Sequence, residues 1–384
     1  MIYLDNAATT PLDPGVRAEM EVYFGEVFGN PNSIHAAGRQ AREAVENARE
    51  TVAACLGASP NEIIFTGGGS ESNNLAIRGV ASARRSRGRR IVVSAIEHPS
   101  VLETCHALER EGFELTIIPV DPTGLVDPAA VADAIESDTI LVTVMHANNE
   151  VGTVESIAVI GDICRERNVY FHSDAVQTTG KLPIDVDALG VDLHSLSGHK
   201  IYGPKGVGAL YIRSGTRLHA QITGGGQEKN RRSGTENVAG IVGLAAALKR
   251  SVDRLGSEAA AETALRDRLL TEIPERVPDT IVTGHPTRRL PNHASFCFRG
   301  VEGEAVLLAL DQIGIAASAG SACSSGSLEP PHALLAMGVP PDYAHGSLRI
   351  SLGRQNTSAD VDAVIESLPP IVAKLRSLAR PAPV

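Results

Sequence analysis

The sequence predicts an α/β fold built on a mostly parallel sheet, with a second, smaller domain. Apolar, β-rich runs alternate with Ala-rich helical runs over much of the chain. The strand-like runs are almost continuously apolar, which is typical of strands buried on both faces of a sheet. The 384 residues exceed the usual size of a single hydrophobic core, so we expect two domains.

The predicted strands and helices follow one another in order from residue 62 to residue 172. Apolar runs predict strands at 62–66, 91–94, 115–118, 140–145 and 169–172. The segments between them have helical spacing of apolar residues and predict helices at 70–86, 101–110, 128–135 and 157–167. Because this alternation is typical of βαβ units, we expect the strands to run parallel.

Long helices flank this region, and the pattern changes near residue 257. Segment 36–55 predicts a helix that Gly57 caps, and segment 238–255 predicts another. Beyond them, helices are predicted at 259–272, 304–313 and 359–378, interleaved with short strands at 295–298 and 348–351. We therefore expect a large domain over residues 15–257 and a small domain formed by residues 1–14 and 258–384.

Composition limits the possible classes of protein. The formal net charge of -10 would repel a phosphate backbone, so we expect no direct binding to nucleic acid. The sequence has neither a membrane-spanning apolar stretch nor a signal peptide, so we expect a cytoplasmic protein without a membrane partner. The arginine run is either a solvated helix end or a docking patch for an acidic partner; it consists of Arg84, Arg85, Arg87, Arg89 and Arg90.

Polar and titratable residues follow five of the predicted strands. Ligands of parallel α/β sheets bind beyond the carboxyl ends of the strands, so these segments predict one shared site. The segments are 67–72, 97–99, 146–150, 172–177 and 197–200.

Three side chains and one loop in these segments suit specific chemistry. The Gly67–Gly69 loop opens a helix whose N-terminus suits an anionic group, but it lacks a nucleotide-binding pattern. A lysine in a desolvated pocket, as we expect for Lys200, can form a Schiff base. Asp174 is a candidate partner for a pyridinium nitrogen, and His98 could lie flat against an aromatic ring.

Cys323 differs in its surroundings from the other cysteines. It lies in a run of Ala, Ser and Gly over residues 316–327, which offers no large apolar residue for a core. An exposed thiol in such a loop is a poor structural element but a good nucleophile. We interpret the other four as core residues: Cys55, Cys105, Cys164 and Cys297. No CxxC pair is present, so neither a disulfide framework nor a metal site is expected.

Taken together, these motifs resemble the cysteine desulfurases of the NifS/IscS type, which belong to the class V aminotransferase group. The resemblance covers nearly the whole chain, and the Cys323 segment is similar to the subgroup with a long cysteine loop. It implies the fold type I architecture of pyridoxal-phosphate (PLP) enzymes, with a mostly parallel seven-stranded sheet between helices and a smaller α+β domain. The matching segments are 3–10, 29–35, 97–98, 148–150, 174–177, 197–206, 232–235, 319–327 and 348–354.

The resemblance implies PLP as the cofactor. Lys200 would be linked covalently to PLP, Asp174 would pair with its pyridine nitrogen, and His98 would stack on its ring and move protons. Gln177 and Asn149 would contact the ring hydroxyl side. The phosphate would be held by Gly69, Ser70, Ser197 and His199.

The resemblance also implies the reaction and the partners. Arg349 and Asn149 would bind the substrate L-cysteine, with Arg349 clamping its carboxylate. Lys200 would remove the α-proton, and Cys323 would take the sulfur as a persulfide while alanine leaves. Thr235 would reach the PLP phosphate of a neighbouring subunit, which implies a homodimer. The persulfide would pass to an acceptor protein for iron–sulfur cluster assembly or thiolation of nucleic acid.

Other functions are compatible with parts of this pattern. A PLP-dependent selenocysteine lyase or an aminotransferase would share most of these residues, although an aminotransferase needs no mobile cysteine. A non-catalytic sulfur-carrier subunit would share the fold, but the presence of Lys200, Asp174, His98 and Cys323 argues against lost catalysis.

Overall fold

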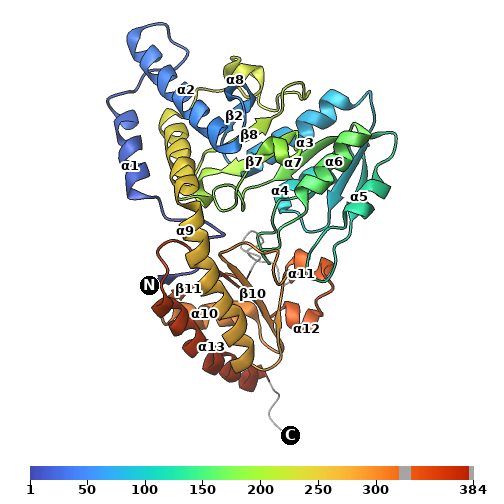
Figure 1. The fold of residues 1–384 in the computed structure, drawn as a ribbon, viewed down its shortest axis with the longest axis vertical. Helices are drawn as coiled ribbons and strands as arrows, with labels where there is room; N and C mark the ends of the chain where they lie inside the picture. The colour runs from blue at the N-terminus through green and yellow to red at the C-terminus, as the bar shows by residue number, and fades with distance from the viewer. Residues whose placement is uncertain (320–329, 380–384) are drawn as a thin grey trace.

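The computed structural model describes residues 1–319 and 330–379. Its larger part is an α/β structure around one sheet, and its smaller part lies at one end and contains most of the C-terminal third of the chain (Figure 1). The helix α9 (Val238–Arg276) runs from the larger into the smaller part.

A seven-stranded sheet forms the centre of the larger part. Along the sheet, the strands lie in the order β2 (Ile63–Thr66), β8 (Gly208–Ile212), β7 (Leu193–Ser197), β6 (Tyr170–Asp174), β5 (Thr139–Thr143), β3 (Arg90–Ser94) and β4 (Glu114–Ile118). β8 is antiparallel to both of its neighbours, and the other pairs are parallel. The mostly parallel sheet expected from the sequence is therefore confirmed, and six of its seven strands have their carboxyl ends at one edge.

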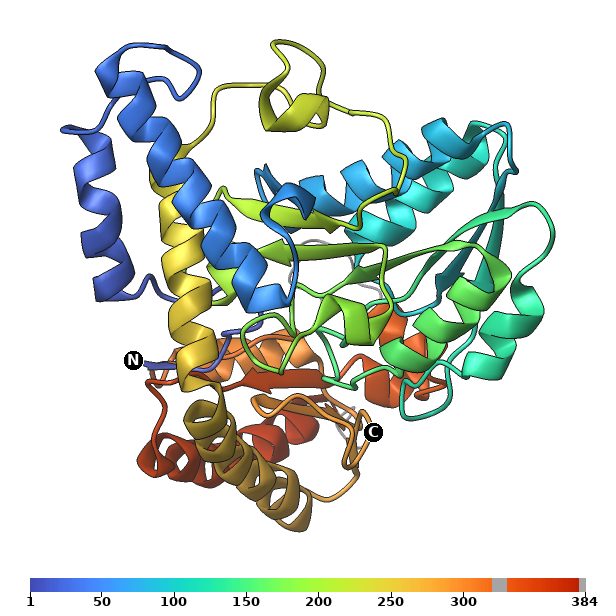
Figure 2. The same ribbon diagram turned by 45° about the horizontal axis from the view of Figure 1, so that its top comes forward.

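Helices cover both faces of this sheet (Figure 2). On one face, a core cluster joins the strands to α3 (Gly69–Arg84) and α4 (Pro99–Arg110). The core on the other face involves α1 (Pro14–Glu21), α2 (Ala36–Leu56), α5 (Pro128–Ala134), α6 (Ile157–Arg167) and the first half of α9. Burial on both faces explains why the strands are almost entirely apolar.

The smaller part has a core of its own. Its antiparallel sheet consists of β12 (Ser347–Ser351), β10 (His293–Phe298) and β9 (Thr280–Val282). Helices α10 (Gly303–Asp311), α13 (Ser358–Ala379) and the second half of α9 pack on it. The N-terminus joins this part, because β1 (Ile2–Tyr3) pairs with β11 (Ile315–Ala316) and Leu4 lies in the same core. The exact domain boundary at residue 257 stays a prediction.

One predicted helix boundary was wrong. We expected one helix to end near residue 255 and another to begin at 259, but α9 is continuous over 39 residues. A glycine costs a helix only about 1 kcal/mol relative to alanine, and Gly256 is followed by the helix formers Ala259, Ala260 and Ala261. Packing of both halves of α9 outweighs this cost. No helix within residues 1–319 and 330–379 is both long enough and apolar enough to cross a membrane.

Candidate active site

The carboxyl ends of the strands surround a cavity of about 350 Å³. It lies between the large sheet and β12 of the smaller part, which contributes Arg349. Most of the predicted site residues line this cavity: Gly69, Ser70, His98, Asn149, Asp174, Gln177, Ser197, His199, Lys200 and Arg349. Cys323 lies outside the described residues. Thr235 is exposed in the segment between α8 (Gln227–Asn230) and α9 and does not line the cavity.

Lys200 ends a short 3-10 helix, η3 (Gly198–Lys200), directly after β7. Its Nζ donates hydrogen bonds to the carbonyl oxygens of Ala7 (2.6 Å) and Ala8 (2.8 Å). The N-terminal turn is itself fixed, because the Ala7 amide donates to the Ser351 hydroxyl at 2.9 Å. Just beyond the lysine, Tyr202 has a φ of 63°, a strained conformation for a residue other than glycine. The ammonium group is therefore held at the cavity wall by a segment distant in sequence.

Asp174 ends β6 and is buried at the wall of the cavity. Its Oδ1 accepts the amide of Val176 at 3.0 Å, and its Oδ2 accepts Nδ2 of Asn73 at 2.7 Å. Asn73, on α3, also donates to Ser100 at 2.8 Å. The carboxylate is thereby fixed in orientation and retains acceptor capacity for a cationic ring nitrogen.

His98 is the N-cap residue of α4. Its Nδ1 accepts the amide of Ser100 at 3.1 Å, so in the neutral ring the proton is on Nε2. Burial lowers the pKa of His98, with a smaller opposing effect from Asp174 and a further lowering by Lys200. The imidazole is therefore neutral near pH 7, and its Nδ1 lone pair is used by the Ser100 amide.

The N-terminus of α3 forms one end of the cavity. Gly68 precedes it with a φ of 148°, and Gly69 and Ser70 open the helix toward Ser197. A side chain at Gly69 would clash, because a Cβ there would lie 2.8 Å from Cγ2 of Val176. Burial lowers the pKa of His199 to about 4, and its Nδ1 lies 3.2 Å from the Thr9 hydroxyl. The free amides and the helix dipole make this end suitable for a phosphate.

Arg349 reaches the cavity from β12. One of its terminal nitrogens donates to the carbonyl oxygen of Asn149 at 2.9 Å, and the other donates to Asp5 at 2.7 Å. Its Nε is buried and has no hydrogen-bond partner among the residues that the structure describes. A carboxylate entering the cavity could accept this N–H and compete with Asp5 for the guanidinium.

Several residues that shape the site escaped the sequence-based prediction. Ala7 and Ala8 act through their carbonyl oxygens, which leave no side-chain signal. Asn73 lies one turn after Ser70 on the same helix, and this spacing was the available signal for it.

The four described cysteines are all poor candidates for the sulfur-accepting nucleophile. They do not line the cavity, and burial raises the pKa of Cys55, Cys164, Cys105 and Cys297, the last two to about 12. Since the thiolate is the reactive form, these thiols are unreactive. The prediction that they are core residues is confirmed for the three that are fully buried, whereas Cys55 is only partly buried.

The fold and the cavity together define a protein of the class V aminotransferase type. The aminotransferase class-V family model matches residues 2–364, so the chain belongs to this family.

Individual relatives are similar over nearly their whole length. The chain is 52% identical to a protein of Dictyoglomus turgidum named cysteine desulfurase IscS, over 98% of this chain and 96% of the relative. It is 51% identical to a protein of the same name from Methanosarcina thermophila, over 98% and 93%. Among solved structures, a NifS-like protein superposes with a TM-score of 0.91 at 39% identity, over 97% and 100% of the two chains. DndA from Streptomyces lividans gives 0.77 at 37% identity, over 91% and 99%.

Proposed function

We propose that this chain is a PLP-dependent cysteine desulfurase that converts L-cysteine to L-alanine and transfers the sulfur to Cys323. The observation that carries the proposal is the assembly of Lys200, Asp174, His98 and Arg349 around one cavity at the edge of the sheet. Relatives with this activity in their names match the chain at about half of all positions.

The residues around the cavity fit PLP. Asp174 would face the ring nitrogen, the start of α3 with Ser197 and His199 would hold the phosphate, and Lys200 would be the covalent attachment point. When bound, PLP supplies an electron-withdrawing ring that stabilises negative charge at the α-carbon of the substrate.

The side chains divide the reaction among them. Arg349 would bind the substrate carboxylate, and Lys200 would remove the proton from the α-carbon. The Cys323 thiolate would supply the electron pair of a new S–S bond as the C–S bond of L-cysteine breaks. The carbon that loses sulfur gains a proton, for which His98 at the cavity wall is a candidate donor. The products are L-alanine and one persulfide.

Chain connectivity supports Cys323 as the acceptor. The Ser318 amide donates to the Arg349 carbonyl at 3.2 Å, and Nε2 of His332 lies 2.9 Å from the carbonyl oxygen of Glu97. The described chain on either side of residues 320–329 is thus attached beside Arg349 and beside His98. In the sequence, Cys323 lies between these two attachment points, four residues after Ala319.

The proposal is tested by alanine formation from L-cysteine with a reductant present. We expect wild type to form alanine and Cys323→Ser to form none, while both keep the visible absorbance of bound PLP. Equal alanine formation by the two proteins would contradict the assignment of Cys323. It would leave a PLP-dependent aminotransferase or lyase as the function.

Selenocysteine lyase activity is the second candidate, because selenocysteine would use the same carboxylate clamp and the same lysine. It differs in needing no persulfide on the enzyme. With a reductant present to convert the released selenium to selenide, we expect Cys323→Ser to form alanine from selenocysteine at the wild-type rate but none from cysteine if both activities belong to this cavity.

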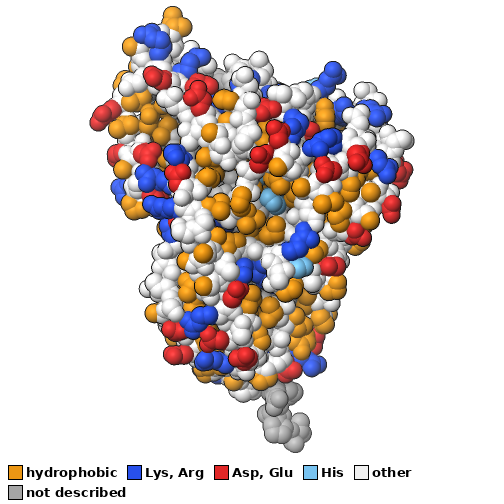
Figure 3. Space-filling model, in the orientation of Figure 1, with side chains coloured by type: hydrophobic (Ala, Val, Ile, Leu, Met, Phe, Trp, Pro, Cys, Tyr) orange, Lys and Arg blue, Asp and Glu red, His pale blue; other side chains and the backbone are white. Residues whose placement is uncertain are grey.

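We further propose that the protein is a homodimer in which Thr235 reaches the partner's PLP phosphate. Large apolar side chains are exposed near α1 and the start of α2: Leu12, Val22, Phe24, Phe28 and Ile34. Figure 3 shows hydrophobic side chains on the surface of this part of the molecule. A second copy covering them would remove this apolar surface from water. We expect the double variant Phe24→Asp/Phe28→Asp to sediment as a monomer with reduced PLP occupancy. A wild type that sediments as a monomer would contradict the proposal.

The persulfide sulfur would pass from Cys323 to an acceptor protein, for iron–sulfur cluster assembly or for thiolation of nucleic acid. Which acceptor is used can be tested by mixing the persulfide-carrying enzyme with candidate scaffold and thiolation proteins and following the sulfur. The cytoplasmic location expected from the sequence stays a prediction.

A further inference from the structure

The side-chain amide of Gln177 has two polar neighbours, and they determine its orientation. Nζ of Lys181 lies 3.4 Å from Oε1 of Gln177, and Nε2 of Gln177 lies 3.0 Å from the carbonyl oxygen of Ala7. A lysine ammonium can only donate and a backbone carbonyl can only accept. The amide oxygen must therefore face Lys181, and the amide nitrogen must face Ala7.

This orientation has a consequence for the cavity that Gln177 lines. One N–H of its amide is used by Ala7, whose carbonyl also accepts from Lys200 at 2.6 Å. The second N–H remains for a ligand, whereas the oxygen is turned away toward Lys181. Gln177 can thus donate into the cavity but not accept from it. Without Lys181, the contact with Ala7 would be the only one of these two left to favour this orientation.

We infer that Lys181 is a positioning residue: it holds Gln177 so that the amide donates a hydrogen bond to an oxygen on the PLP ring. The inference rests on the proposed function, which does not itself use Lys181. Lys181 would act only by orienting Gln177, because Lys181 itself does not line the cavity of about 350 Å³.

A second, small cavity places Lys181 together with carboxylates that favour its charged form. It lies beside Lys200, has a volume of about 20 Å³ and is lined by Lys181, Glu258 and Glu262 among others. This volume suits about one water molecule with polar partners on several sides. A single water could therefore join the ammonium of Lys181 to a carboxylate.

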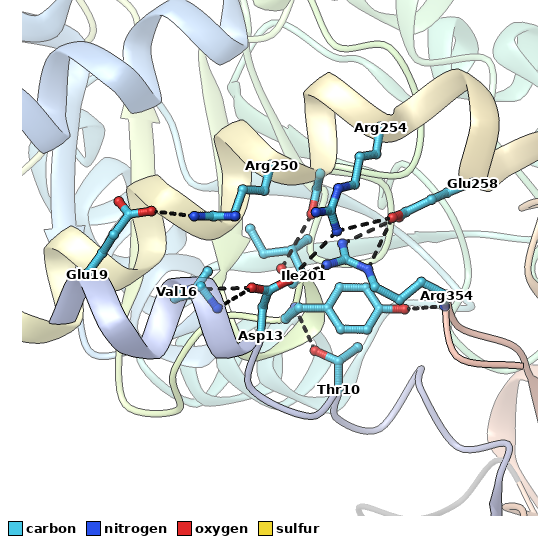
Figure 4. Close-up of polar contacts among 12 residues, drawn as sticks. Thr10, Asp13, Val16, Glu19, Ile201, Arg250, Arg254, Glu258 and Arg354 are labelled. Atoms are coloured by element: carbon cyan, nitrogen blue, oxygen red, sulfur yellow. Dashed lines mark hydrogen bonds and ion pairs between the residues drawn. The ribbon is translucent and has the colours of Figure 1, made fainter. Parts of the chain in front are cut away.

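Of the two carboxylates in this small cavity, Glu262 is the one available to Lys181. Glu258 is paired with Arg354 at 3.1 Å and lies 4.0 Å from Arg254, in the network that Figure 4 shows. Asp13 takes a further contact from each arginine, at 2.8 Å from Arg354. Glu262 is buried and forms no ion pair within 4 Å among the residues that the structure describes. Glu262 is therefore the carboxylate of this cavity that is left to interact with Lys181.

Titration of these groups agrees with this geometry. Burial lowers the pKa of Lys181 to about 8, opposed by Glu262. Burial raises the pKa of Glu262 to about 7, opposed by Lys181. The other charged or titratable groups that interact with Lys181 or share its small cavity are Lys200, Arg349, His199, His293, Glu258 and Tyr202. Lys181 is thus mainly protonated at neutral pH and becomes a neutral amine within a moderately alkaline range.

The inference is tested on the PLP-loaded enzyme by titrating the visible absorbance of the bound cofactor with pH. Lys181→Met removes a positive charge and leaves the amide oxygen of Gln177 without its donor, so we expect the midpoint to rise by about 0.5–1 pH unit, the equivalent of one hydrogen bond. Lys181→Arg keeps a charged donor and should restore the midpoint. Lys374→Met, at an exposed position on α13, is the matched control and should not change it.

The outcomes separate the inference from the proposed function. A Lys181→Met enzyme that binds PLP and titrates at the wild-type midpoint would overturn the inference, while alanine formation would leave the proposed function intact. If Lys181→Met does not fold, Glu262→Gln is the second variant. It should shift the midpoint in the same direction by lowering the protonated fraction of Lys181, and an unchanged midpoint would equally overturn the inference. A wild type that binds no PLP would overturn the proposed function and the inference with it.

Discussion

At the residue scale, a single substitution can test the role of the Asp174 charge. Asp174→Asn would keep the shape of the side chain and the acceptor for the Val176 amide, but it would lose the charge that we propose pairs with the ring nitrogen of PLP. Hydrogen bonds to charged groups contribute about 1.5–3 kcal/mol, so we expect alanine formation to fall about 10- to 100-fold. PLP absorbance should report that the cofactor is still bound. An Asp174→Asn enzyme with the wild-type rate would show that the charge is not used.

The sequence predicted the side chains that line the site better than the groups that hold those side chains in place. Lys200, Asp174 and His98 stood out because polar residues at the ends of apolar strands are unusual. The carbonyl of Ala7 could not be predicted, since its role depends on a turn held by Ser351 at the other end of the chain. Thr235 and Cys323 remain predictions, because one lies away from the cavity wall and the other lies outside the described residues.

At the scale of elements, the segment around α8 depends on one buried ion pair. Three successive residues of this segment, Glu228, Lys229 and Asn230, have positive φ values, which are unfavourable for side-chain-bearing residues. Glu228 compensates by accepting two hydrogen bonds from Arg49 and one from the Phe65 amide, each at 2.8 Å. Figure 2 shows the loop with α8 standing above the sheet, and it leads directly to Thr235.

Removal of this pair should destabilise the protein strongly. We expect Glu228→Ala to lower the free energy of unfolding by about 3–5 kcal/mol, because it removes the buried partner of the Arg49 charge and leaves only the exposed Glu46 paired with it. Glu236→Ala removes an exposed contact with Asn32 and should cost about 0.5 kcal/mol or less. Urea unfolding measures both. If both variants lost the same free energy of unfolding, burial of the Arg49–Glu228 pair would not explain its contribution to stability.

The arginine run shows how local sequence can mislead about a surface. Arg84 and Arg85 stack over Tyr170 and Phe113, at 4.5 Å and 5.4 Å from the ring centroids. Arg90 pairs with three acidic side chains, including Asp138 at 3.1 Å. Much of the charge is therefore used within the protein, which favours a structural interpretation over a docking patch. Sequence could not reveal this, because the partners lie on other strands and in the segments that precede them.

At the scale of the whole molecule, buried titratable groups should make stability depend on pH. Burial lowers the pKa of His146 from 6.5 to about 4. Between these values the unfolded chain binds a proton that the folded protein does not, so stability falls as pH decreases from 6.5 to 4. Glu150 acts in the opposite sense: burial raises its pKa from 4.5 to about 7, so its contribution is lost as pH rises through that range.

The contribution of one histidine can be isolated by comparing wild type with His146→Gln. The difference in unfolding free energy between the two should change by up to about 3 kcal/mol from pH 6.5 to pH 4, with wild type losing more. Above pH 7 the difference should be constant. A difference that does not change with pH would mean that His146 titrates normally in the folded protein.

The overall architecture was predictable because it depends on repeated local patterns, whereas long-range contacts were not. Alternating strands and helices predicted the sheet, and its mostly parallel order was confirmed. The pairing of β1 with β11 joins residues more than 300 positions apart, and two-residue strands carry no periodicity. The continuity of α9 likewise depends on two cores that local propensity does not describe.

The central claim is that sulfur from L-cysteine becomes bonded to Cys323, and mass spectrometry of the protein tests it most directly. The PLP-loaded enzyme would be incubated with equimolar L-cysteine without a reductant and then digested. We predict that the peptide containing Cys323 gains one sulfur atom and that a reductant removes it. The peptides containing Cys55, Cys105, Cys164 and Cys297 should be unchanged, because burial raises the pKa of these thiols. Alanine formed without added sulfur on the Cys323 peptide, or with sulfur on one of the other four cysteines, would contradict the account.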